Sequence, residues 1–408
     1  MILTKKQEEG LRIAVERYKN NETWTCISGY AGSGKSTLIK FIIAALDLKD
    51  EEVCYVAFTG KAATVLQKKG CPNATTAHKL LYKARQKADG TFVFIPKTKF
   101  DLEQYKVIVV DEVSMLPIQM WNKMLEHKIH IIATGDPGQL PPIDKEADNH
   151  VLDHPHIFLD EIMRQAQDSE IIRLSMWIRE GKDIKNFPCE NKQVQIFSES
   201  ESNIGMYNWA DQVLCATNNT RNSINNFMRK EKGFGIEPAI GDKIIGLHNH
   251  WEYFSNTGNS VLTNGTIGYI ENYEINMRYL PRYISSEPIA YMHTNIKVED
   301  EDNEFFYGTP IDYKALTKNE PALTPRQSYL MKKNKNITIE PPFDFAYAYA
   351  ITTHKAQGSE WDKVLVVEER FPFDKEEHIK WLYTAATRAK EKLVIIRKYR
   401  SNNGTIYN

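Results

Sequence analysis

A glycine-rich octapeptide constrains the fold of this chain more than any other segment. Residues 29–36 read GYAGSGKS and satisfy the pattern G-x-x-x-x-G-K-[ST]. The β-branched run 23–28 stands directly before it, and the apolar stretch 36–46, which has helical periodicity, follows it. In this context the glycines let backbone N–H groups curl around phosphate oxygens, and the helix N-terminus adds partial positive charge. The sequence therefore predicts an α/β domain with a phosphate-binding loop.

The polar side chains of this loop predict a bound nucleotide and a metal ion. Lys35 is expected to reach the terminal phosphates, and the Ser36 hydroxyl to coordinate Mg²⁺. A flexible glycine loop without a ligand is the alternative, and the placement between strand and helix disfavours it. The predicted nucleotide-binding residues of the loop are Gly29, Tyr30, Ala31, Gly32, Ser33, Gly34, Lys35, Ser36 and Thr37.

Two later segments supply the carboxylates and the amide that such a site needs. Asp111 and Glu112 follow the apolar run 105–110. We expect Asp111 to hold Mg²⁺ through water and Glu112 to orient and deprotonate the attacking water. Gln139 lies in TGDPGQLPPI, residues 134–143, and is expected to bond the γ-phosphate or that water. A plain turn is the alternative for this last segment.

The bulk properties exclude several classes of protein. With 408 residues the chain exceeds the usual size of one hydrophobic core, so two or more domains are expected. A formal net charge of −1 gives no polycationic surface, so nucleic acid would have to bind in a groove. Five cysteines without a CxxC pair indicate free thiols in a cytoplasmic setting. The charged N-terminus and the lack of a long apolar run argue against secretion and against a membrane partner.

The order of apolar runs predicts two α/β domains, the second of them interrupted. β-branched runs alternate with helical stretches in the first half of the chain, which is typical of a doubly wound parallel sheet. Further strand-like runs follow at 206–218, 362–369 and 391–399. The predicted domains are 1–165, with a hairpin inserted at 83–102; 166–245 plus 341–408; and an inserted β-rich module, 246–340.

The predicted hairpin is centred on Asp89-Gly90, a strong turn signal between two potential strands. Phe92 and Phe94 are two residues apart on one of these strands and so share a face. The segment is locally basic, which favours proximity to phosphates. Packing of both rings onto their own domain is the alternative to contact with a ligand.

Five sequence blocks together resemble the motifs of superfamily 1 helicases. The blocks GYAGSGKST, DEVSM, GDPGQLPPI, THKAQGSEW and YTAATRA stand in the order and spacing of that superfamily. They are similar to its RecD-like branch, and especially to the compact phage helicases of the Dda type. The resemblance implies two RecA-like P-loop NTPase domains, ATP hydrolysis, and 5′-to-3′ movement on single-stranded DNA. It further implies that the hairpin is a pin that splits the duplex and that 246–340 is an SH3-like domain.

The resemblance also implies further nucleotide contacts. Gln7, in LTKKQEEG, matches the glutamine that reads the adenine edge; a solvated helix residue is the alternative. Arg164, in DEIMRQAQ, and Arg388, in YTAATRA, match the two arginines that reach the γ-phosphate. A planar guanidinium suits the charge that builds on phosphoryl oxygens during transfer. A surface salt bridge is the alternative for each arginine.

The contacts with the nucleic-acid strand are implied in the same way. Hydroxyls, backbone N–H groups and lysines bind phosphates without reading bases, which suits a motor that steps over any sequence. A core position is the alternative for the histidine at 78. The matching residues of the first domain are Thr59, Lys61, Thr76 and His78, with Phe92 and Phe94 at the pin, and those of the second are Thr217, Asn218, His354 and Lys355.

The predicted function is therefore that of an ATP-dependent DNA helicase. A translocase or clamp ATPase that does not separate strands is the alternative, and only the hairpin distinguishes the two. The predicted partners are ATP, Mg²⁺, single-stranded DNA and single-strand/duplex junctions, with single-strand-binding or replication proteins as further candidates. No oligomerisation signal stands out, so a monomer is expected, in the host cytoplasm if a phage encodes it. Replication, recombination and repair are not distinguished.

Overall fold

The computed structural model consists of two compact units. One unit comprises Met1–Thr217 and Thr352–Asn408, and the other comprises Asn218–Ile351. The structure describes residues 3–86, 92–141, 148–163, 168–258, 260–299, 301, 303–334, 341–372 and 374–397.

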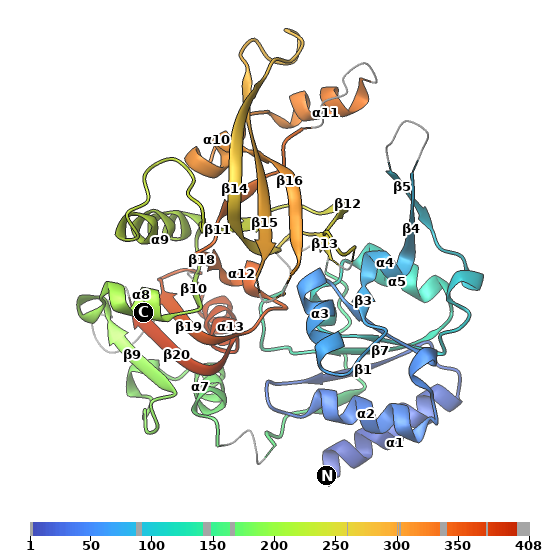
Figure 1. The fold of residues 1–408 in the computed structure, drawn as a ribbon. Helices are drawn as coiled ribbons and strands as arrows, with labels where there is room; N and C mark the ends of the chain where they lie inside the picture. Colours follow the sequence, from blue (N-terminus) through green and yellow to red (C-terminus); the bar gives the residue numbers. More distant parts are fainter. Residues whose placement is uncertain are drawn as a thin grey trace. The chain divides into compact units, whose positions relative to one another are not determined.

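The first parallel sheet has six strands in the order β3-β2-β6-β7-β1-β8 (Figure 1). Its strands are β1 (Trp24–Gly29), β2 (Val53–Ala57), β3 (Thr75–Thr76), β6 (Val107–Val110), β7 (His130–Gly135) and β8 (Ile157–Leu159). The β-branched runs form its centre because they are buried on both faces, as is usual for parallel strands. The predicted α/β fold with a parallel sheet core is thus confirmed.

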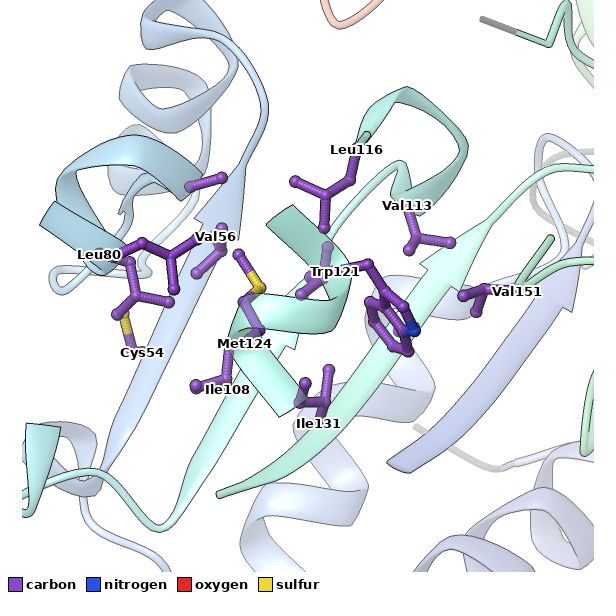
Figure 2. Close-up of a cluster of buried hydrophobic side chains, with 14 of the residues drawn as sticks. Cys54, Val56, Leu80, Ile108, Val113, Leu116, Trp121, Met124, Ile131 and Val151 are labelled. Carbon is purple, nitrogen blue, oxygen red and sulfur yellow. The ribbon is translucent and has the colours of Figure 1, made fainter. Parts of the chain in front are cut away.

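Alternate residues of the central strands enter two separate cores, one on each face of the sheet. Ile108 and Ile131 pack on one face with Trp121 and Met124 of the covering helix (Figure 2). Val107, Val109 and Ile132 join the core on the other face. The helices of this half are α1 (Lys5–Lys19), α2 (Lys35–Ala45), α3 (Gly60–Lys68), α4 (Ala77–Leu81) and α5 (Ile118–Glu126), with the short helices η1 (Asp50–Glu52), η2 (Lys99–Leu102) and η3 (Val113–Met115).

A two-stranded antiparallel hairpin projects from this half. Strand β4 (Tyr82–Gln86) pairs with β5 (Phe92–Pro96), in register from Tyr82 opposite Pro96 to Gln86 opposite Phe92. The expected span of 83–102 is too long at its C-terminal end, because Lys99–Leu102 forms η2, in which Asp101 accepts the Thr98 N–H. The expected turn at Asp89-Gly90 lies outside the described residues.

The second parallel sheet has five strands in the order β18-β10-β19-β20-β9. Its strands are β9 (Val194–Ser198), β10 (Gln212–Cys215), β18 (Ala350–Thr352), β19 (Trp361–Glu368) and β20 (Ala389–Arg397). The helices and short helices of this half are α7 (Glu170–Arg179), η5 (Ile184–Asn186), η6 (Glu199–Glu201), α8 (Ile204–Trp209), α12 (Thr353–Ala356) and α13 (Lys375–Ala386).

A buried glutamate fixes the turn that leads into β9. The side chain of Glu170 is fully buried and accepts backbone N–H groups of Glu190, Asn191, Gln193 and Val194. Burial alone would raise the pKa of Glu170, but these N–H groups together hold it below its ordinary value. The Glu170 carboxylate therefore accepts the backbone N–H groups of this turn, as a neighbouring strand would in a sheet.

The inserted unit is built on a five-stranded antiparallel sheet with the order β16-β15-β14-β11-β17. The strands of this sheet are β11 (Lys243–Gly246), β14 (Ile267–Arg278), β15 (Ile289–Val298), β16 (Phe305–Asp312) and β17 (Phe345–Tyr347). The strands β12 (His250–Phe254) and β13 (Val261–Leu262) of the same unit pair with each other in a separate sheet. Its helices are α9 (Asn218–Glu231), α10 (Tyr313–Lys318) and α11 (Pro325–Lys333).

The expected boundaries of the insertion, 246 and 340, fall inside this unit. Strand β11 pairs with β14 and β17, so the antiparallel sheet begins before 246 and ends after 340. A buried ion pair between Arg229 and Asp242 fastens α9 to the start of β11. These pairings join segments far apart in sequence, which a local pattern does not reveal.

Two broader expectations concern membranes and thiols. No helix in the described ranges is long and apolar enough to cross a membrane. All five cysteines, Cys26, Cys54, Cys71, Cys189 and Cys215, are free thiols.

Candidate nucleotide and nucleic-acid sites

The glycine-rich loop joins β1 to α2 and requires glycine at several positions. Gly32 and Gly34 have φ values of 77° and 82°, in the left-handed region that favours glycine. A Cβ atom on Gly34 would lie 2.5 Å from Gln7 Nε2, and one on Gly29 would lie 2.7 Å from Leu159 O. The backbone therefore packs too closely for any side chain, which is what a phosphate-cradling loop needs.

Lys35 opens α2 and folds back over the loop. Its Nζ donates to Gly29 O at 2.6 Å and to Tyr30 O at 3.1 Å. Burial lowers the pKa of the Lys35 ammonium, while the carboxylates of Asp136, Asp111 and Glu112 oppose the shift. A desolvated cation at a helix N-terminus suits a polyanionic ligand.

The two acidic residues follow β6, as expected. Thr134 Oγ1 lies 2.9 Å from Asp111 Oδ1, which also accepts the Glu112 N–H at 3.1 Å. Glu112 has a φ of 49°, a strained conformation for a non-glycine residue that is common at functional sites. Burial raises the pKa of Glu112, and the cation of Arg388 opposes that shift.

Arg388 reaches this site from the second sheet. It follows α13, is buried, and places Nη1 3.6 Å from Glu112 Oε1. Its Nε donates to Thr384 O at 3.1 Å, and Nη1 donates to Ser359 O at 3.4 Å. Glu112, the predicted base after a strand of the first sheet, and Arg388, the predicted arginine of the second, therefore approach each other. The alternative for Arg388 was a surface salt bridge; its guanidinium is buried, and its salt bridge is made with Glu112.

The loop that carries Gln139 is held largely by the second sheet. Tyr383 Oη donates to Asp136 Oδ2 at 2.6 Å, and Asp136 Oδ1 accepts the Gly138 N–H at 2.9 Å. Leu140 N–H donates to Thr384 Oγ1 at 2.9 Å, and Leu140 O accepts from Gln357 Nε2 at 2.8 Å.

Sequence reasoning gave no role to Tyr383, Thr384 or Asp136. They lie inside the quoted blocks YTAATRA and GDPGQLPPI, so their presence in two motifs was the available signal. Their pairing depends on packing between two sheets, which neither block reveals alone.

Gln7 lies against the phosphate loop and not in solvent. It is 1% exposed, so the alternative of a solvated helix residue is wrong. Its Oε1 accepts the Thr4 N–H at 3.0 Å, and its Nε2 donates to Ser33 O at 3.3 Å. The side chain thus links the start of α1 to the loop. Arg164 lies outside the described residues.

Comparisons with known proteins agree with this geometry. The model of the AAA domain matches residues 3–198, and the UvrD-like helicase C-terminal domain matches residues 347–396. The ATP-dependent DNA helicase dda of Enterobacteria phage T4 is 24% identical over 95% of this chain and 98% of that protein. The ATP-dependent RecD2 DNA helicase of Deinococcus radiodurans is 27% identical over 90% of this chain, which spans 46% of that protein.

This chain belongs to the superfamily 1 helicases of the RecD, Pif1 and Dda type. It is accordingly an ATP-hydrolysing enzyme. The fold is also that of the Pif1 helicase from Candida albicans, with a TM-score of 0.51 and 18% identity over 100% of this chain and 97% of that one. The Bacteroides Pif1 helicase in complex with ADP-AlF3 and ssDNA gives a TM-score of 0.52 at 16% identity, over 100% of this chain and 95% of that one.

A cavity of about 70 Å³ lies between Glu112 and the start of α3. Thr59, Glu112, Gly358 and Arg388 are among the residues that line it. A Cβ atom on Gly358 would lie 3.4 Å from Thr59 Oγ1 and 3.5 Å from Glu112 Oε2. Thr59 and Glu112 therefore both lie beside Gly358.

The predicted strand contacts of the first sheet lie at helix starts. The hydroxyls of Thr59 and Thr76 accept the N–H groups of Ala62 and Lys79, each at 3.2 Å. A capping hydroxyl still has its own hydrogen to donate to a phosphate. His78 is half-buried, its ring stacks on that of Tyr82 with 5.7 Å between centroids, and burial lowers its pKa.

Three further residues of this half were predicted to contact the strand, and the structure describes the side chain of one of them, Phe94. The Phe94 side chain is 38% exposed on β5, so it does not enter the core of the sheet. The side chains of Lys61 and Phe92 lie outside the described ones.

The predicted strand contacts of the second sheet follow β10 and β18. Thr217 donates its N–H and its hydroxyl to the carboxylate of Glu369, each at 3.2 Å, and sequence reasoning missed this acidic partner. Asn218 is exposed at the first turn of α9. His354 and Lys355 lie half-buried on α12, and burial lowers the pKa of His354.

Proposed function

We propose that this helicase couples ATP hydrolysis to 5′-to-3′ movement along single-stranded DNA and to separation of duplex DNA. The observation that carries the proposal is the approach of Arg388, from the second sheet, to Glu112 of the first at 3.6 Å. A hydrolytic site whose residues come from two sheets changes its geometry when the sheets move. The names of the T4 and Deinococcus relatives describe ATP-dependent DNA helicases, which supports DNA as the track.

The residues present fit ATP and Mg²⁺. The left-handed Gly32 and Gly34 curl the loop toward the N-terminus of α2, where phosphates would bind, and Lys35 supplies the cation there. Ser36, exposed at the start of α2, and Asp111, held by Thr134, would hold Mg²⁺. The ion would neutralise charge on the phosphates when bound.

Hydrolysis would proceed by in-line attack of water on the γ-phosphate. Glu112 orients the water and takes its proton at a carboxylate oxygen, and its raised pKa makes it a stronger base than an exposed glutamate. Arg388 leaves Glu112 to contact the γ-phosphoryl oxygens, where a guanidinium stabilises the charge of the transition state. Gln139 is proposed to orient the same water from the loop after β7.

Movement would follow from one grip on each sheet. Thr59 and Thr76 are proposed to bind phosphates on the first sheet, with Lys61 and His78 beside them. His354 and Lys355 are proposed to bind on the second, with Thr217 and Asn218. Closure around ATP and opening after hydrolysis would then shift one grip past the other by a fixed step.

The exposed Phe94 is proposed to stack on the last base pair at the junction, as an aromatic pin. Its loss should leave DNA-stimulated ATP hydrolysis intact and lower strand separation several-fold. Paired ATPase and unwinding assays of Phe94→Ala test this. Equal loss of both activities would assign the ring to the fold of the hairpin instead.

Strand-separation assays on duplexes with either a 5′ or a 3′ single-stranded tail test the function. Lys35→Ala removes the phosphate-binding cation, and Lys40→Ala, an exposed lysine of the same helix, is the matched control. We expect unwinding of the 5′-tailed duplex alone, lost only in Lys35→Ala. Unwinding of the 3′-tailed duplex alone would reverse the polarity. Hydrolysis without unwinding of either would favour a translocase or clamp.

The proposed cellular setting is the cytoplasm, that of the host if a phage encodes the chain. Single-strand/duplex junctions are the proposed substrate, and a monomer the proposed active form. Single-strand-binding and replication proteins are proposed as neighbours on the same DNA.

A further inference from the structure

We propose that Tyr383 and Arg179 are positioning residues that fasten the first limb of the phosphate loop, Tyr30 and Ala31, to the second sheet's helices. The inference rests on the ATP-driven function proposed above. It adds a link between the two sheets that is independent of the γ-phosphate.

Tyr383 holds the backbone of the loop directly. Its hydroxyl accepts the Ala31 N–H at 2.9 Å and donates to Asp136 Oδ2 at 2.6 Å. The residue is 1% exposed, and burial together with Asp136 keeps its pKa well above the ordinary value, so the hydroxyl retains its proton. The packing is close, because a Cβ on Gly138 would lie 3.1 Å from the ring.

Arg179 holds the neighbouring residue by its side chain. Its guanidinium lies 3.4 Å from the centroid of the Tyr30 ring, which is a close cation–π contact. The other side of the arrangement is braced by Phe158, whose ring meets that of Tyr30 edge-on at 5.5 Å. Arg179 Nη1 is buried and has no hydrogen-bond partner among the described residues, so the ring of Tyr30 is a main contact of this guanidinium.

The contacts made by Arg179 and by Tyr383 come from two helices that are packed together. Arg179 ends α7 and Tyr383 lies in α13, and these helices pack on each other. They grip consecutive residues of a limb whose carbonyl groups, Gly29 O and Tyr30 O, also hold Lys35. The limb from which the lysine must depart to meet phosphate is therefore positioned by the second sheet.

This arrangement predicts a thermodynamic linkage. A loop held in its binding shape loses less conformational freedom when a nucleotide arrives, so it binds more tightly. We call the contacts of Tyr383 and Arg179 with the loop the latch. If binding of DNA moves the second sheet, the latch transmits that movement to the nucleotide site, and the affinities for DNA and for nucleotide become coupled reciprocally. A residue that only supports the fold would change stability without changing that coupling.

The first test measures the affinity for a fluorescent ADP analogue without DNA. Tyr383→Phe removes one hydroxyl, and Arg179→Gln removes the cation while keeping a polar side chain. We expect each to raise the Kd roughly fivefold, which is the effect of one hydrogen bond or one cation–π contact. The matched controls are Tyr55→Phe, a half-buried tyrosine on β2, and Arg12→Gln, exposed on α1; both should keep the wild-type Kd.

The second test repeats the titration with saturating oligothymidylate. The ratio of Kd values with and without the oligonucleotide should approach one in Tyr383→Phe and Arg179→Gln and differ from one in wild type and controls. Arg179→Lys keeps the charge but not the planar stack, so partial recovery would separate the two contributions. Because both residues hold one limb, the double variant should lose less than the product of the single losses.

Three results would overturn the latch. The first is that both single variants keep the Kd and the Kd ratio of the wild-type protein. The second is that the control variants lose as much affinity, and the third is that the wild-type protein itself shows a Kd ratio of one. The affinity without DNA does not depend on motor activity. Failure of the wild type to unwind would therefore refute the proposed function while leaving the latch decided by its own measurement.

Discussion

Two desolvated glutamates, one in each half of the first unit, have opposite pKa shifts. Glu112 follows β6, keeps 29% of its side chain exposed, and has a pKa raised by burial. Glu170 begins α7, is completely buried, and has a pKa lowered by backbone N–H groups that outweigh its burial. Desolvation raises the pKa in both cases, yet the two net shifts have opposite signs.

The difference lies in the donors that each carboxylate receives. Glu170 takes four backbone N–H groups, which satisfy its charge and leave nothing for chemistry. Glu112 is approached by the charged guanidinium of Arg388 at 3.6 Å, which is longer than a hydrogen bond. A carboxylate left short of donors in a desolvated site is suited to accept a proton, whereas a saturated one holds the fold.

The largest expected difference between substitutions of Glu112 and of Glu170 is in the rate of ATP hydrolysis. Glu112→Gln removes the proton acceptor, so steady-state ATP hydrolysis should fall roughly 100-fold or more, while ADP binding is retained. Glu170→Gln should hydrolyse ATP at close to the wild-type rate at a temperature where it is folded. If Glu112→Gln kept more than a tenth of the wild-type rate, the assignment of the base would be wrong.

The next effect is on stability. Glu170→Gln replaces the acceptor of four N–H groups with an amide, which should cost about 1–3 kcal/mol of unfolding free energy at pH 7. The folded pKa is the lower one, so the stabilisation is complete above the ordinary value of 4.5 and is lost as the pH falls through the folded value. Urea unfolding at pH 7 and pH 4 should show the difference shrinking at the lower pH. An equal difference at both pH values would contradict this account.

A smaller effect concerns the pH profile of hydrolysis. The base must be ionised, and the pKa of Glu112 is raised in the ligand-free protein, so the acid limb of kcat/KM, which reports the free enzyme, should lie above pH 4.5. Arg388 opposes the rise in the free enzyme, so Arg388→Gln should move the normalised limb of kcat/KM to higher pH as well as lowering kcat. Profiles of both proteins, each scaled to its own plateau, provide the measurement. A limb that stays in place would remove Arg388 from the electrostatics of Glu112.

The smallest effect tests whether charge or hydrogen bonds hold Glu170. Arg173 lies 3.8 Å from Glu170 Oε1 and bonds more closely to Glu190, at 2.8 Å. Because these contacts are half-exposed, Arg173→Gln should change the Tm by only a degree or two. Thermal melts beside Glu170→Gln give the comparison. A loss as large as that of Glu170→Gln would mean that the ion pair dominates.

The parts of this protein that could be predicted from sequence depend on neighbours along the chain. The turn at 29–36 needs glycines between a strand and a helix, and Asp111 and Glu112 need only to follow an apolar run. Each pattern is local, so it determines its structure wherever it occurs. Arg388 was singled out through the resemblance of its motif, and its role at the γ-phosphate stays a prediction, with its side chain 3.6 Å from Glu112.

The remainder depends on contacts that no local pattern encodes. The contact of Tyr383 with Ala31 joins residues 352 positions apart, and the Glu369 bonds to Thr217 span 152. The edges of the insertion were misplaced because β11 and β17 pair across about 100 intervening residues. Glu170 looked like an ordinary first-turn glutamate, and only the fold brings the turn 190–194 to it.

Leu140 illustrates how this long-range dependence affects attempts to recombine the protein. Its N–H is bonded by Thr384 of α13 and its carbonyl by Gln357 in the turn between α12 and β19, although the loop is encoded with the first sheet. A chimera that exchanged the C-terminal half with that of a relative would leave the loop without its anchors. Residues 136–140 should therefore be transplanted together with residues 353–388, as one inheritable module that joins the two parallel sheets.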